Sequence, residues 1–193
     1  MQQVIIKRQC RRHNILQISR YLILTAILSF IGWLYEVFLV RFKYGHWSDR
    51  GFLWLPFCPI YGGTLVFVYF FMGTPKEKRG ILKKIENPYL HTALYLFFAF
   101  LIPTIAELSV ALFFDKTFHL FLWNYAKMPL NFHGYISIPV SVLWSALIYI
   151  FMRFFFTPLQ KLVAKIPKNI AAIFAVVLCL SVIMDAVIQF ITI

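Results

Sequence analysis

Five stretches of about 20 mostly apolar residues run along this chain, and their length constrains the fold more than any other feature. A helix needs about 20 apolar residues to cross the hydrocarbon core of a membrane, and ordinary soluble domains lack such stretches. We therefore predict an all-α fold, a polytopic bundle of about five transmembrane helices. The predicted spans are residues 21–41, 52–72, 89–114, 136–156 and 169–192.

The composition supports a membrane protein and excludes a nucleic-acid-binding one. The chain has 193 residues, of which 61% are hydrophobic and only 13% charged, whereas a soluble domain carries about 25% charged residues. The net charge of +12 would suit a nucleic-acid-binding protein, but the basic residues lie in the gaps between apolar spans rather than on one soluble face. We therefore expect the lipid bilayer, and not nucleic acid, as the main partner.

The basic residues also predict the orientation of the chain, because membrane proteins keep lysine and arginine in their cytoplasmic loops. Most of the 19 basic residues fall on one side, and these are Lys7, Arg8, Arg11, Arg12, Arg20, Lys76, Lys78, Arg79, Lys83, Lys84, Arg153, Lys161, Lys165 and Lys168. The other side has only Arg41, Lys43, Arg50, Lys116 and Lys127. We predict a multi-pass plasma-membrane protein with a cytoplasmic N-terminus and an outer C-terminus. Residues 1–20 would form a basic cytoplasmic arm, and residues 21–193 a single transmembrane domain.

The outer half of the second predicted span is poorly suited to a helix. It contains Pro56, Pro59, Gly62 and Gly63, and proline removes a backbone donor and disturbs the preceding turn. Non-helical backbone survives at membrane depth only where it is buried in protein or lines a cavity. We predict a broken second span that lines a polar cavity together with Tyr61, although a simple proline kink would use the same residues.

The outer segment between the third and fourth spans, residues 115–135, is too aromatic for a free loop and too short for a span. Phe118, Leu122 and Tyr125 recur at helical spacing, with Phe121 beside them, and Trp123 and Tyr125 would lie at the level of the lipid headgroups. This pattern predicts an outer interfacial helix, which would act either as an anchor or as a lid over the polar site.

Three acidic residues lie inside the predicted spans, close to their outer ends. A rise of about 1.5 Å per residue places Glu36 about 7 Å, Glu107 about 10 Å and Asp185 about 12 Å inside the membrane. Ionisable groups at such depth usually face a bundle interior or a water-filled cavity. Ser141 falls at a similar depth in a stripe of serines, although such serines can also mark helix packing alone.

Arg50, at the mouth of the broken span, is the best partner for these acids. Three carboxyls beside one or two cations leave an excess of negative charge, which suits a cationic substrate group, a metal ion or a proton relay, unless one carboxyl stays protonated. The candidate substrate-binding or coupling residues are Glu36, Arg50, Pro56, Pro59, Tyr61, Glu107, Asp185 and Ser141.

Sequence motifs of several well-known chemistries are missing. The chain has no Walker-type glycine loop, no nucleophile elbow and no His-Glu-x-x-His zinc motif. The spacings of its histidines match no standard metal site. We therefore predict no metal centre and no cofactor, and we assign no catalytic residue.

Four motifs follow one another along the chain. They are Gly32-Trp-Leu-Tyr-Glu36, Arg50-Gly-Phe-Leu-Trp-Leu-Pro-Phe-Cys-Pro-Ile-Tyr-Gly62, Glu107-Leu, and Trp123-Asn-Tyr followed by Met128-Pro-Leu-Asn131-Phe-His-Gly134. Through them, residues 25–190 resemble the bacterial family named putative ABC-transporter type IV, a CmpB-like permease family. The resemblance implies about five spans, the same acids, and a transport role that would use a separate ATPase subunit.

The chain departs from this family pattern at two positions. The family usually has an acid where Asn124 stands and an arginine where Tyr135 stands. If these two residues form an ion pair in relatives, this chain has lost both partners together. The three membrane acids and Arg50 then remain the stronger candidates.

Three functions stay open on the sequence. A transport component ranks first because of the broken span and the acids, either as a permease with an ATPase or as a small proton-coupled transporter. A non-catalytic membrane partner subunit ranks second, and a lipid-active membrane enzyme that uses the buried carboxylates ranks third. Five spans are few for a complete pathway, which is compatible with a homodimer.

Overall fold

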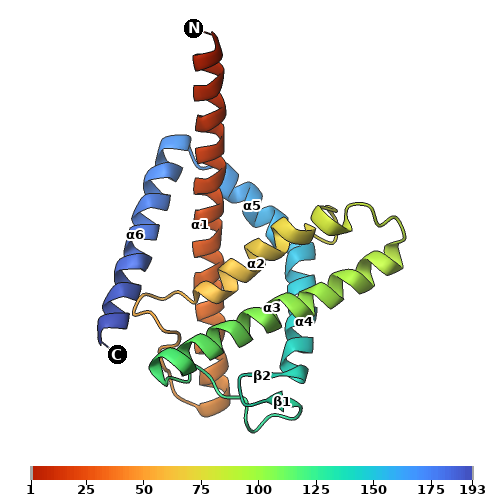
Figure 1. The fold of residues 1–193 in the computed structure, drawn as a ribbon, viewed down its shortest axis with the longest axis vertical. Helices are drawn as coiled ribbons and strands as arrows, with labels where there is room; N and C mark the ends of the chain where they lie inside the picture. The colour runs from red at the N-terminus through yellow and green to blue at the C-terminus, as the bar shows by residue number, and fades with distance from the viewer. Residues whose placement is uncertain (1, 193) are drawn as a thin grey trace. The chain divides into compact units, whose positions relative to one another are not determined.

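A computed structural model describes the backbone of residues 2–192 and the side chains from Leu16 to Thr192, and the chain is predominantly helical, as predicted (Figure 1). Four basic side chains of the predicted cytoplasmic arm, Lys7, Arg8, Arg11 and Arg12, lie outside the described side chains.

The described residues form six α-helices, one short 3-10 helix and one antiparallel hairpin. The helices are α1 Gln2–Tyr44, α2 Pro59–Met72, α3 Pro88–Phe118, α4 Ile138–Phe154, α5 Phe156–Ala164 and α6 Lys168–Thr192, with η1 at Gly80–Leu82. The hairpin joins β1 Asn131–Phe132 to β2 Ile136–Ser137, with Asn131 paired to Ser137 and Phe132 to Ile136.

Three helical stretches are long and apolar enough to cross a membrane: Leu16–Tyr44 of α1, the whole of α3 and the whole of α6. Helices α4 and α5 pass the same test together but bend by 48° between them, so they count as a fourth candidate. Helix α2 is apolar, has 14 residues and is shorter than a span. The described part of the chain therefore has three or four candidate spans, where the sequence predicted five.

The chain divides into two compact units. The first contains the residues up to Gly62 and those from Leu159 onward, and in it α1 packs along α6 (Figure 1). The second is Gly63–Pro158, and in it α3 packs against α4, with β2 beside both helices.

Helix α6 exposes most of its apolar side chains. Ile173, Phe174, Leu180 and Met184 are each more than half exposed, although nothing in their chemistry favours water. A helix of a soluble protein would bury such a face, whereas a membrane helix presents it to lipid. The exposed apolar surface therefore supports a membrane location.

The prediction of an outer interfacial helix within residues 115–135 is wrong. Helix α3 continues to Phe118, where His119 ends it in the left-handed backbone region with a φ of 53°. Residues 119–130 then form a non-helical loop that leads into the hairpin.

Turn-forming residues explain why the helical spacing in this segment was misleading. Pro129 cannot donate a backbone hydrogen bond, and Gly134 adopts a φ of 77°, which favours glycine. The aromatic side chains pack on one another instead of along a helix, since the rings of Phe121 and Tyr135 stack with centroids 6.0 Å apart.

Candidate functional site

Residues 51–58, which precede α2, are not helical, and the sequence explains why. Gly51 has a φ of 98°, and Pro56 lies at the centre of a tight turn in which Phe57 N donates to Leu55 O at 2.6 Å. Pro59 then begins α2, at a position where the missing N–H costs nothing. The residues directly before α2 are therefore a non-helical segment, which we call the 51–58 segment.

Asp185 of α6 binds the backbone of the 51–58 segment. Its Oδ2 accepts a hydrogen bond from Leu55 N at 2.8 Å and its Oδ1 accepts one from Trp54 N at 3.3 Å, while the residue is only 7% exposed. Ser29 of α1 also contributes, because its carbonyl oxygen accepts from Cys58 N at 3.1 Å. Backbone N–H groups of the 51–58 segment that make no helical hydrogen bond thus donate to acceptors on α6 and α1.

Glu36 of α1 lies beside the same segment and has two neighbours. Its Oε1 accepts a hydrogen bond from Tyr61 Oη at 2.8 Å, and its Oε2 lies 3.7 Å from Arg50 Nε. Arg50 Nε is buried and makes no hydrogen bond within the described residues, so this contact is an ion pair of looser geometry. The structure brings together Glu36, Arg50 and Tyr61 from the predicted set.

Two glycines allow this approach of α1 to the start of α2. A Cβ on Gly32 would lie 2.4 Å from the ring of Tyr61, and a Cβ on Gly62 would lie 2.1 Å from Thr25 O. Both distances are far below van der Waals contact. The two glycines are therefore required for Tyr61 to reach Glu36.

Sequence reasoning missed Asp49, which lies next to Arg50. One carboxylate oxygen, Oδ1, accepts from Trp33 Nε1 and from Arg50 N, both at 2.9 Å. Its position in the sequence could have revealed it, because Asp49 directly precedes Arg50, the residue predicted to pair with the membrane acids. We call Glu36, Asp49, Arg50 and Tyr61 the Glu36 cluster.

The second unit holds the other two predicted site residues, Glu107 and Ser141. Glu107 of α3 has its Oε1 3.4 Å from Tyr125 Oη, at the long end of hydrogen bonding. Ser141 of α4 is buried, and its Oγ makes no hydrogen bond within the described residues. One turn further on, Ser145 Oγ donates to Leu96 O at 2.8 Å, which fits the packing interpretation of the serine stripe.

The two positions that depart from the family pattern have separate partners. Asn124 Oδ1 accepts from Ala126 N at 2.8 Å and so stabilises its own turn. Tyr135 Oη instead donates to Asp115 Oδ2 at 2.7 Å, at the end of α3. In this chain, position 135 thus pairs with Asp115, an acid that sequence reasoning did not single out.

The bond between Tyr135 and Asp115 makes a testable prediction about pH. This hydrogen bond, above all, raises the pKa of Tyr135 from its ordinary value of 10.0. Because the folded pKa lies above the unfolded one, the stabilisation is complete below pH 10 and is lost as pH rises through the folded pKa. An absorbance titration, with Tyr135→Phe subtracted, should show this tyrosine ionising above pH 10. Asp115→Asn should lower that pKa, and an unchanged pKa would contradict the assignment.

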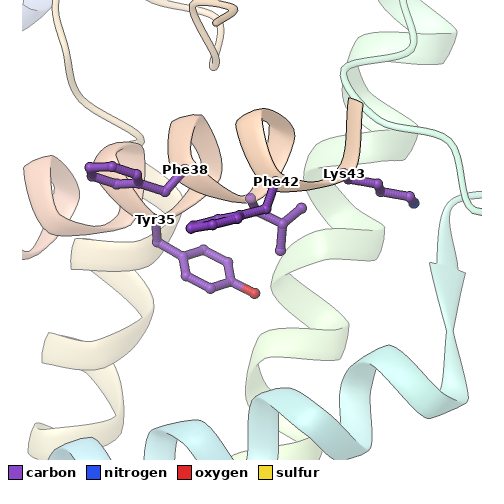
Figure 2. Close-up of a pocket in the computed structure, with 5 residues that line it drawn as sticks. Tyr35, Phe38, Phe42 and Lys43 are labelled. Atoms are coloured by element: carbon purple, nitrogen blue, oxygen red, sulfur yellow. The ribbon is translucent and has the colours of Figure 1, made fainter. Parts of the chain in front are cut away.

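An apolar groove runs along the last turns of α1 and is separate from the Glu36 cluster. It is lined by Tyr35, Phe38, Leu39, Phe42 and Lys43, and Figure 2 shows Tyr35 and Phe42 turned toward the same side of the helix. All five residues come from one helix, and neither Glu36 nor Arg50 lines the groove. Its lining offers little for a polar substrate to bind.

No group of three or more His, Cys, Asp or Glu side chains within the described residues is placed to hold a metal ion. A family model described as putative ABC-transporter type IV matches residues 23–190. No curated protein and no solved structure matches the chain.

Proposed function

The chain belongs to the family described as putative ABC-transporter type IV, and from this premise we propose that it is a permease-like membrane subunit of a transporter, working with a separate ATPase. The observation that carries the proposal is a half-buried acid, Glu36, paired to a tyrosine and an arginine that flank non-helical backbone. Transporters commonly build their binding sites from such interrupted helices.

We infer that α2 and the 51–58 segment together make a fifth crossing. The 14 residues of α2 extend about 21 Å, whereas the hydrocarbon core is about 30 Å thick. The 51–58 segment supplies the missing length, and its hydrogen bonds to Asp185 and Ser29 support its placement at membrane depth.

The distribution of basic residues favours a full crossing of the membrane rather than a re-entrant loop. If residues 51–72 entered and left on the same side, the basic loop with Lys76, Lys78 and Arg79 would face outward, against the positive-inside rule. A full crossing keeps this loop in the cytoplasm. The N-terminus is then cytoplasmic and the C-terminus lies outside the plasma membrane.

In this proposal, Glu36 is the substrate-contacting acid in the outer half of the bilayer. Its side chain is 24% exposed, and Arg50 lies 3.7 Å away without a hydrogen bond to it. A cationic group of a substrate would therefore compete with a loosely held arginine rather than with a tight bidentate pair. Tyr61 would hold the carboxylate in place during this exchange.

The other candidate residues take supporting or coupling roles. Asp185, Pro56 and Pro59 maintain the unwound backbone, as their contacts and positions indicate. Glu107 and Ser141 lie in the second unit and would have a coupling role there, with Tyr125 as the donor to Glu107. The pathway of so small a bundle would be completed by a second copy of the chain.

The proposal is tested by purifying the tagged chain from its native membrane in mild detergent and measuring ATP hydrolysis in the preparation. We expect an ATPase to purify with it, and we expect Glu36→Gln to lower the hydrolysis rate about tenfold, because the loss of a hydrogen-bonded charge costs at least about 1.4 kcal/mol. Glu86→Gln, at an exposed acid of the basic loop, should leave the rate unchanged.

Other outcomes would redirect the assignment. A chain that purifies alone but consumes a lipid would be an enzyme. A chain that brings only a non-ATPase membrane protein, and keeps its function in Glu36→Gln, would be a partner subunit. Either result would contradict the permease proposal.

A further inference from the structure

The helices on either side of α5 restrict where it can lie relative to the membrane. Helix α5 follows α4 after a bend of 48°, and only residues 165–167 separate it from the candidate span α6. The bend turns α5 away from the direction of α4, and the exposed Lys161 and Lys165 favour the membrane surface over the hydrocarbon core. The position of α5 is independent of the transport function proposed above.

One face of α5 and the residues just after it are fixed to α1. Gln160 Nε2 donates to Tyr21 Oη at 3.2 Å, and Arg20 Nη2 donates to Ala164 O at 2.6 Å. Val163, on the same side as Gln160, is only 3% exposed. The opposite face of the helix is consequently the one that meets the surroundings.

That opposite face, together with the residues that follow α5, presents one apolar side chain and three exposed lysines. Leu162 is 61% exposed, and Lys161, Lys165 and Lys168 are all exposed. Among the described residues, the ion pairs to acids involve Arg50 and Lys116, and none involves these three lysines. A leucine between lysines at a membrane surface is typical of an interfacial helix.

We propose that α5 lies along the bilayer surface with Leu162 in the acyl region, and that Lys161, Lys165 and Lys168 bind the phosphate groups of anionic phospholipids. Lipid is favoured over an acidic protein because residues 165–167 join α5 closely to the candidate span α6 and because the exposed Leu162 needs an apolar medium. Lysines beside a membrane helix attract anionic headgroups in this way. The inner leaflet is the side that the positive-inside rule assigns to this loop.

The test uses the full chain in nanodiscs of phosphatidylcholine alone or with phosphatidylglycerol added. We expect phosphatidylglycerol to raise the thermal unfolding midpoint and to slow hydrogen exchange in residues 156–168. Each lysine is expected to contribute about fivefold to the affinity for anionic lipid. Replacing all three lysines with glutamine should therefore remove most of the shift, while Lys83→Gln with Lys84→Gln, in the basic loop of the second unit, should preserve it.

The unsubstituted protein provides a second measurement if the triple variant does not fold. Raising the salt concentration from about 0.05 to 0.5 M should shrink the shift, because surface charges are screened beyond the Debye length. Two results would overturn the inference: a shift that survives both salt and lysine replacement, or an equal loss in the variant of Lys83 and Lys84. If an acidic protein bound the unsubstituted chain but not the triple variant, in nanodiscs of either composition, this face would instead be assigned to a protein partner.

Discussion

Replacing Asp185 with leucine is expected to lower the free energy of unfolding by about 2–5 kcal/mol. The change leaves Trp54 N and Leu55 N, which make no helical hydrogen bonds, without their acceptor. Asp185→Asn, which retains one acceptor oxygen, should cost about half as much. Thermal unfolding in detergent, followed by circular dichroism, measures both effects.

Ser181→Leu is the matched control, because Ser181 lies one turn earlier on α6 and is exposed. It should change stability by less than about 0.5 kcal/mol. If Asp185→Leu were no worse than Ser181→Leu, the claim that this carboxylate stabilises the 51–58 segment would be wrong.

The adjacent glycines Gly62 and Gly63 are expected to respond in opposite ways to alanine. A Cβ on Gly62 would meet Thr25 O at 2.1 Å and Ser29 Oγ at 2.4 Å, both on α1. Overpacking of this kind costs about 1–3 kcal/mol, and it would move Tyr61 away from Glu36. Gly63 has open space around its Cβ position, so alanine there should be neutral or stabilise α2 by up to about 1 kcal/mol.

The same unfolding assay, run on the two alanine variants side by side, measures this contrast. Both variants replace glycine with alanine at adjacent positions of α2. The gain in helix propensity is therefore the same in both and cancels when their stabilities are compared. Equal stabilities would mean that α1 and α2 do not pack as closely as the structure has them.

Long apolar runs made much of this fold predictable. Helices α3 and α6 were expected at 89–114 and 169–192 and are found at Pro88–Phe118 and Lys168–Thr192. Pro103 lies inside α3 without ending it, as membrane helices tolerate. Residues 51–58 are not helical, as their prolines and glycines indicate locally, while the second span itself stays a prediction.

What the sequence could not provide depends on contacts between distant residues. Asp185 and Leu55 are 130 positions apart, and nothing near either one indicates that a carboxylate would bind this backbone. The bond from Tyr135 to Asp115 was missed for the same reason. The false interfacial helix arose because a window of aromatic residues mimicked helical spacing while its turn residues decided the backbone.

The most direct test of the central claim is the topology of the chain, read from reporters that are active on only one side of the membrane. One is fused after residue 193 and one is inserted near Glu86. If α2 and the 51–58 segment make a full crossing, the C-terminus lies outside and Glu86 lies in the cytoplasm with the N-terminus. A cytoplasmic C-terminus together with an outer Glu86 would mean that residues 51–72 form a re-entrant loop, and would contradict the account.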